Sequence, residues 1–186
     1  DGFGFELGRA LEARGISSKL LLRANVPTFT YTKLINSQTD AEDLPRVDFI
    51  NPDPIDKAVE TELIARLEQV APAYDLILVS DQAETEWGGV VTAGVRDALA
   101  RIGATRSGPL IWADSRMRAE HFRHVAMKAN FDEAFAASKR TIGREDFNAL
   151  RRHMQTDLLV VTCGPRGAMV IQESGVQWTS AKRVDK

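Results

Sequence analysis

The sequences Asn130-Phe131-Asp132-Glu133 and Thr162-Cys163-Gly164-Pro165-Arg166-Gly167 each follow a short apolar run, and they decide how the rest of the chain is interpreted. The first comes after His124 to Lys128, and the second comes after Leu158 to Val161. An amide and a carboxylate three residues apart at a helix start suit a hydrated cation or a phosphate. A strand that ends in Thr-x-Gly-x-x-Gly offers a hydroxyl and open backbone to a nucleotide. Both motifs are therefore candidate parts of a nucleotide site.

Each motif also has a purely structural interpretation. Asn130 followed by Glu133 is the pattern of a helix capping box. Gly164 and Gly167 suit a hairpin turn between two strands. The interpretations are compatible, because a capped helix start still presents N–H groups and partial positive charge to a phosphate. The residues alone leave both open.

Short apolar strands alternate with amphipathic helices from residue 55 onward, which predicts an α/β domain whose parallel sheet is covered on both faces. Three strands end in a polar residue, namely Asp81, Asp114 and Thr162, and ligands bind at the carboxyl ends of such strands. Asp81 and Asp114 are candidate substrate contacts or else caps, and Arg116 and Lys128 are candidate phosphate ligands or else solvated. The expected strands are 76–79, 109–113, 125–127, 158–161, 168–171 and 176–178, and the expected helices are 55–71, 90–102, 131–137 and 145–154.

The first 50 residues follow a different pattern. Asp1 is a candidate N-cap for a helix that closes at Gly15. Residues 28–35 and 46–50 are strand-like, with a polar turn over 36–43 between them. We expect this hairpin to be a small β element separate from the sheet.

The composition and the missing motifs argue against several classes of function. The 186 residues suit one domain, with 44% hydrophobic residues, 27% charged residues and a net charge of −2, which disfavours a nucleic-acid-binding face. Arg116, Arg118, Arg123 and Lys128 cluster locally and are interpreted as a solvated face. No run approaches the length of a membrane helix, and no histidine has metal-ligand spacing. The sequence contains no P-loop and no Rossmann glycine motif.

The single cysteine allows no intramolecular disulfide and fits a reducing, cytoplasmic compartment. Cys163 has no base near it in sequence, which argues against a nucleophile. The three tryptophans, Trp87, Trp112 and Trp178, are expected to be at least partly buried.

The order of these elements resembles the middle of a ribokinase-like (PfkB) carbohydrate kinase. Asn130–Glu133 and Thr162–Gly167 match the family's Asn-x-x-Glu and Thr-x-Gly-x-x-Gly motifs, and Asp114-Ser115-Arg116 is similar to its Asp-Pro-Lys strand end. Other matching segments are Asp1–Leu7 (an early Gly-Asp-Asp-x-x-Gly helix), the turn Gly15-Ile16-Ser17, the lid start Pro27-Thr28 and the strand Asp75–Asp81. Ser80-Asp81, Arg46-Val47-Asp48 and Thr28–Lys33 look most like the kinase half of bifunctional ADP-heptose synthases.

The resemblance implies a three-layer α/β/α domain over residues 1–186 with residues 28–50 as part of a lid, and ATP-dependent phosphorylation of a sugar hydroxyl. Asn130 and Glu133 would order Mg²⁺ and phosphates, and Thr162–Gly167 would line the nucleotide. Asp81, Asp114 and Arg116 would lie on the side of the sugar or sugar-phosphate substrate. Lid hairpins in this family often pair between subunits, so a homodimer through this hairpin is a further expectation.

The chain departs from the family at both ends. The family's first strands would precede Asp1, and its catalytic Gly-Ala-Gly-Asp loop would follow Lys186. We therefore expect a central piece of a longer kinase that is inactive alone, and Asp185 is not assigned as its base. Lys128-Ala129 and Arg116 also replace the family's Thr-Pro and Lys. The alternative is a non-catalytic α/β module, derived from the same fold, that binds a ligand or a partner.

Overall fold

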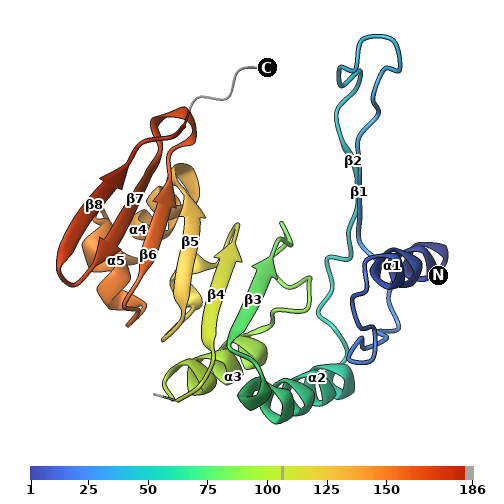
Figure 1. Cartoon of the computed structure of the whole chain (residues 1–186), viewed down its shortest axis with the longest axis horizontal. Helices are drawn as coiled ribbons and strands as arrows, with labels where there is room; N and C mark the ends of the chain where they lie inside the picture. The colour runs from blue at the N-terminus through green and yellow to red at the C-terminus, as the bar shows by residue number, and fades with distance from the viewer. Residues whose placement is uncertain (106, 183–186) are drawn as a thin grey trace.

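Six strands form one sheet in the computed structural model of the chain, which describes residues 1–105 and 107–182. Neighbouring strands follow the chain order, the first four are parallel, and the last two are antiparallel (Figure 1). This confirms the expected α/β fold with a mostly parallel sheet. The strands are β3 (Leu76–Asp81), β4 (Leu110–Ser115), β5 (Ala126–Asn130), β6 (Leu159–Thr162), β7 (Ala168–Gln172) and β8 (Gly175–Thr179).

The helices begin at side chains that cap them. Asp1 and Asp56 accept from the backbone N–H groups of Gly4 and Ala58 at 2.8 and 2.7 Å, and Thr92 accepts from the N–H of Val95 at 3.2 Å. The helices are α1 (Gly2–Ala13), α2 (Lys57–Val70), α3 (Ala93–Gly103), α4 (Phe131–Ile142) and α5 (Phe147–His153), with short 3₁₀ turns η1 (Ala71–Ala73), η2 (Ala119–His121) and η3 (Gly164–Arg166).

One face of the sheet carries the core. Leu99 of α3, Ala137 of α4 and Leu150 of α5 pack in one buried cluster with strand residues such as Ile111 and Val161. Because β3 to β6 follow one another in a single direction, right-handed crossovers place the connecting helices on the same face. The hydrophobic effect of this one cluster therefore holds the sheet and helices together.

The other face differs from the expectation that helices cover both sides. Leu76, Leu78 and Leu110 point to it and are exposed, with Leu78 at 70% of its full exposure. Within residues 1–105 and 107–182, helices α3, α4 and α5 supply only one of the two layers expected around the sheet. Wholly apolar strands predicted burial on both faces, and the described part of the chain buries one.

The N-terminal hairpin stands apart from the sheet, as expected (Figure 1). β1 (Thr30–Thr32) pairs antiparallel with β2 (Val47–Phe49), and Ile35 and Glu42 form a further bridge before the turn. At its base, Asp1 accepts hydrogen bonds from both the N–H and the hydroxyl of Thr28, at 2.8 and 2.9 Å. The carboxylate that caps α1 thus also anchors the start of the hairpin.

Two of the three tryptophans are more exposed than the sequence suggests. Trp87 and Trp178 are exposed at 64% and 52%, so the expected partial burial is wrong for both, whereas Trp112 is half-buried. Asp185 lies outside the described residues. Among those that are described, no helix combines the length and the apolar character that crossing a membrane requires.

Candidate active site

Polar residues meet in pairs at the carboxyl ends of the parallel strands. The register places Asp81 beside Ser115, Asp114 beside Lys128, and Asn130 beside Thr162. These pairs cross the sheet from β3 to β6 along a single edge. The sequence expectation that ligand-binding side chains gather at this edge therefore has a structural basis.

Asn130 and Glu133 form a complete capping box at the start of α4. The Asn130 side-chain oxygen accepts from the Glu133 N–H at 2.9 Å, and Glu133 Oε2 accepts from the Asn130 N–H at 2.7 Å. The structural interpretation of this motif is thus confirmed. It does not exclude ligand binding, because no described residue hydrogen-bonds to Oε1 of Glu133, and α4 presents its positive end at the same point.

The Thr162–Gly167 segment forms the turn between β6 and β7, so the hairpin interpretation is also confirmed. Gly167 has φ of +108°, and a Cβ there would lie 1.9 Å from the carbonyl oxygen of Thr179. Only glycine fits that position. Arg166 lies over the ring of Phe131, with Cζ 5.7 Å from the ring centre. This stacking joins the turn to the first residue of α4.

A small cavity of about 260 Å³ lies between the two motifs. Its walls bring together most of the residues that the sequence assigned to the nucleotide. Phe131 and Asp132 also line it, and sequence reasoning had given neither a role. Glu133, Pro165 and Gly167, which the sequence also assigned to this site, do not line it. The lining residues are Asn130, Phe131, Asp132, Thr162, Cys163, Gly164 and Arg166.

Asp114 and Arg116 have side-chain partners within the chain. Lys128 Nζ donates to Asp114 at 2.9 Å, which forms a half-buried ion pair in the middle of the strand edge. Arg116 donates to the Gln82 side-chain oxygen at 2.9 Å and also pairs with Glu84. Lys128 thus partners a strand-end carboxylate, and Arg116 leans toward the segment that follows β3.

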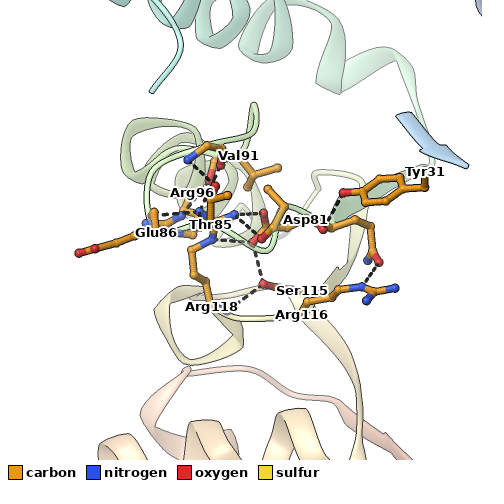
Figure 2. A network of polar contacts seen from close by, with 12 residues as sticks. Tyr31, Asp81, Thr85, Glu86, Val91, Arg96, Ser115, Arg116 and Arg118 are labelled. Carbon is orange, nitrogen blue, oxygen red and sulfur yellow. Dashed lines mark hydrogen bonds and ion pairs between the residues drawn. The ribbon is translucent and has the colours of Figure 1, made fainter. Parts of the chain in front are cut away.

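Asp81 is buried, at 2% exposure, and its carboxylate is held by Arg118 and Ser115 (Figure 2). Arg118 donates to both carboxylate oxygens, at 2.5 and 3.1 Å, and the Ser115 hydroxyl donates at 2.7 Å. Arg118 is itself only 9% exposed, so its interpretation as part of a solvated basic face is wrong. The sequence carried one weak signal for this contact. Arg118 comes shortly after one predicted strand, and the predicted strand before it ends at the acidic residue Asp81.

A much larger hollow of about 890 Å³ lies between the N-terminal elements and the end of β3. Asp81 belongs to its wall although its carboxylate points to Arg118. The hollow and the small cavity share no lining residue, so the site has two separate recesses at one sheet edge. Asp1, Thr28 and Tyr31 line the hollow from the hairpin side.

The oxygen donors at the small cavity fit Mg²⁺ only if phosphate oxygens of a bound ligand complete the coordination. Among the residues that the structure describes, no three His, Cys, Asp or Glu side chains gather as a metal site. Of the residues that line the cavity, Asp132 offers a carboxylate, and Asn130 and Thr162 offer neutral oxygens; Glu133, which does not line it, offers a second carboxylate at the same helix start. One or two carboxylates together with phosphate oxygens is the usual way in which a protein holds Mg²⁺.

Comparisons with known proteins agree with this architecture. No family model matches the chain. The bifunctional protein HldE of Hyphomonas neptunium is 34% identical over 140 residues, which cover 71% of this chain and 28% of that protein. Among solved structures, ribokinase from Thermotoga maritima superposes with a TM-score of 0.65 at 15% identity over 99% of this chain. Phosphofructokinase-2 from Escherichia coli in complex with fructose-6-phosphate gives 0.68 at 13% identity over 98%.

The chain therefore has the ribokinase-like fold of the PfkB carbohydrate kinases, and it is distantly similar to HldE. It spans 58% of the ribokinase chain and 60% of the phosphofructokinase-2 chain.

Proposed function

We propose that this chain is the nucleotide-side portion of an ATP-dependent kinase that phosphorylates a hydroxyl of a sugar or sugar phosphate. The observation that carries the proposal is the register of β5 and β6, which sets Asn130 beside Thr162 at the rim of one cavity. The ribokinase-like fold and the similarity to HldE support the reaction class.

In this proposal, the small cavity takes the nucleotide phosphates. Arg166 supplies positive charge, and Thr162 and the turn backbone supply hydrogen bonds. Asn130 and Glu133 order Mg²⁺, with Glu133 acting through water and Asp132 as an additional carboxylate. Bound Mg²⁺ would neutralise charge that develops on the transferred phosphoryl group. The residues of this chain would then contribute positioning and electrostatics.

The hollow takes the acceptor in this proposal, and the hairpin of β1 and β2 serves as part of its lid. Asp114 and Arg116 lie at the strand edge between the two recesses. The resemblance places the base that accepts the hydroxyl proton outside residues 1–186. We therefore expect that the chain alone transfers no phosphate.

The test uses the full-length protein with ATP, Mg²⁺ and a panel of acceptors. Ribose, fructose 6-phosphate and a heptose phosphate represent neutral and phosphorylated sugars. Release of ADP and the gain of one phosphoryl group by the acceptor, measured by mass spectrometry, would support the proposal. If no acceptor is phosphorylated and ATP does not bind, the non-catalytic module is the better description.

A pair of variants separates the two roles of Glu133. Glutamine can still accept the Asn130 N–H, so Glu133→Gln should leave stability nearly unchanged, whereas Glu133→Ala should lose about 1 kcal/mol. Both remove the carboxylate, so both should raise the Mg²⁺ concentration for half-maximal turnover about 10- to 100-fold. An unchanged Mg²⁺ titration for Glu133→Gln would show that this carboxylate only caps α4.

A further inference from the structure

The segment of residues 82–91, between β3 and α3, separates the hollow from the buried side chain of Arg118. We call it the 82–91 loop. Five of its residues form one wall of the hollow, and the loop has few buried apolar side chains of its own. Its shape therefore depends on polar contacts with the rest of the chain. The wall residues are Gln82, Ala83, Gly89, Val90 and Val91.

Arg118 makes four of those contacts, more than any other single residue (Figure 2). While Nε and Nη2 bind the carboxylate of Asp81, Nη1 lies 3.3–3.4 Å from the carbonyl oxygens of Thr85, Glu86 and Gly88. Nη2 also lies 3.5 Å from the carbonyl oxygen of Ala83. These contacts are individually long, but four carbonyl dipoles converge on one buried cation. A single guanidinium thus joins the end of β3 to the middle of the loop.

The geometry requires arginine in particular. Its planar fork presents several donors in fixed directions, whereas lysine presents one compact ammonium group. A lysine at position 118 could neutralise Asp81 but could not reach the strand end and the loop carbonyls together.

Arg96 of α3 holds the far end of the loop, because it donates to the carbonyl oxygen of Val91 at 2.8 Å. Burial, and then the charge of Arg118, lower the pKa of Arg96.

The lid hairpin rests on the opposite side of the same loop. The Tyr31 hydroxyl donates to the carbonyl oxygen of Gln82 at 3.2 Å, and Arg46 lies 3.7 Å from Glu84. Arg46 also stacks on the Tyr31 ring, with Cζ 4.8 Å from its centre. The loop is therefore both a wall of the hollow and the seat of the hairpin.

We propose that Arg118 is a positioning residue for the acceptor side of the site. It fixes the 82–91 loop, and through the loop it fixes one wall of the hollow and the surface that the hairpin contacts. It does not line the hollow itself. The proposal rests on the proposed kinase function for the identity of the ligand, and it adds a residue that sets acceptor affinity without touching the nucleotide cavity. No residue of that cavity belongs to the loop.

The first test uses the full-length protein and a protease that cleaves after glutamate. Glu84 and Glu86 are exposed in the loop, and Glu173 is exposed in the turn between β7 and β8, where it serves as an internal reference. Arg118→Lys keeps the charge beside Asp81 and should still fold. We expect cleavage after Glu84 and Glu86 to accelerate at least tenfold, with cleavage after Glu173 unchanged. Equal rates at the loop sites in both proteins would overturn the proposal.

Arg140→Lys is the matched control. Arg140 also bridges a buried carboxylate, that of Glu120, and a backbone carbonyl, that of Met117, but its hydrogen bonds go to the segment that carries Arg118 and not to the loop. We expect the control to leave loop cleavage unchanged. Comparable acceleration in the control would mean that loosening of the segment around Arg118, or of the protein as a whole, opens the loop without loss of the Arg118 fork, which would also overturn the proposal.

The second test uses the full-length protein and whichever of ribose, fructose 6-phosphate or a heptose phosphate it phosphorylates. Arg118→Lys should raise the KM for that acceptor at least tenfold and leave the KM for ATP within twofold. Equal changes in both constants, or none, would overturn the acceptor assignment. If the wild-type protein phosphorylates none of the three, the proposed function fails and the acceptor assignment fails with it, whereas the cleavage rates still decide whether Arg118 holds the loop.

Discussion

Replacing Arg140 by methionine should destabilise the chain by about 3 kcal/mol at pH 7, the lower end of the cost of breaking a buried ion pair. Glu120 is 2% exposed, and Arg140 binds both of its oxygens at 2.5 and 3.0 Å. Without that partner the carboxylate stays buried and uncompensated. The lower end applies because the Arg140 side chain is 49% exposed, so water can reach part of the site.

The stability difference between the wild type and Arg140→Met should depend on pH, because it depends on the ionisation of Glu120. Burial alone would raise the pKa of Glu120, but the hydrogen bonds from Arg140 and from the Glu120 backbone N–H, together with the charges of Arg140 and His121, outweigh burial and hold that pKa below its ordinary value. In the wild type, this stabilisation is present above the unfolded pKa of about 4.3 and is lost as pH falls through the lower folded pKa. In Arg140→Met, burial dominates and raises the folded pKa. Its cost at neutral pH is relieved as pH falls through that raised pKa, so the difference between the two proteins should shrink as pH falls from 7 toward the unfolded pKa of about 4.3.

Urea unfolding of both proteins at several pH values between 7.5 and 4.5 measures this difference directly. At pH 7 the expected loss corresponds to a fall in Tm of about 6–12 °C for a chain of this size. Arg66→Met is the control, because Arg66 pairs with Glu62 on the exposed face of α2 and its loss should cost less than about 1 kcal/mol. A loss of under 1 kcal/mol in Arg140→Met, or a difference that stays constant with pH, would refute the reasoning.

Two further predictions concern the turn after β6 and the hairpin of β1 and β2. Gly167→Ala should cost at least about 3 kcal/mol, because it combines a left-handed backbone with a clash against Thr179, whereas Gly143→Ala, at φ of +81° in open space, should cost about 1 kcal/mol. Thermal unfolding compares them, and equal losses would show that the clash is relieved. The full-length protein should have the mass of a dimer in solution, and Phe49→Glu, on the exposed face of β2, should make it monomeric. A monomeric wild-type mass would count against pairing through the hairpin.

The elements of the sheet were predictable because their signals are local. Alternation of apolar runs and amphipathic helices gave the order of β3 to β8, and the pattern Asn130 to Glu133 gave the capping box at α4. The start of α3 was placed early, at Val90 rather than Ala93, because the apolar residues before Thr92 belong to the 82–91 loop. Local pattern cannot separate the first turn of a helix from a loop residue such as Val91, which packs against the same core.

The burial of Arg118 could not be predicted from the sequence. Its main partner, Asp81, lies 37 residues away, and its other partners are backbone carbonyls that carry no sequence signal. Composition rules assign such an arginine to the surface, since unpaired cations are rarely buried. The open face of the sheet could not be predicted either, but here the sequence predicts too much burial. Apolar strands such as β3 indicate that both faces of the sheet are covered, whereas the helices of the described residues cover only one face.

The two recesses of the site are built by different physical means, and this makes them separable by mutation. The proposed nucleotide side depends on strand register and on hydrogen bonds between residues three apart, as in Asn130 and Glu133. The proposed acceptor side relies, in our inference, on one buried cation, Arg118, that joins segments more than 30 residues apart. A change at position 133 should therefore alter metal and nucleotide handling while the hollow keeps its shape, and a change at position 118 should do the reverse. Variants at these two positions should combine additively, since they share no contact.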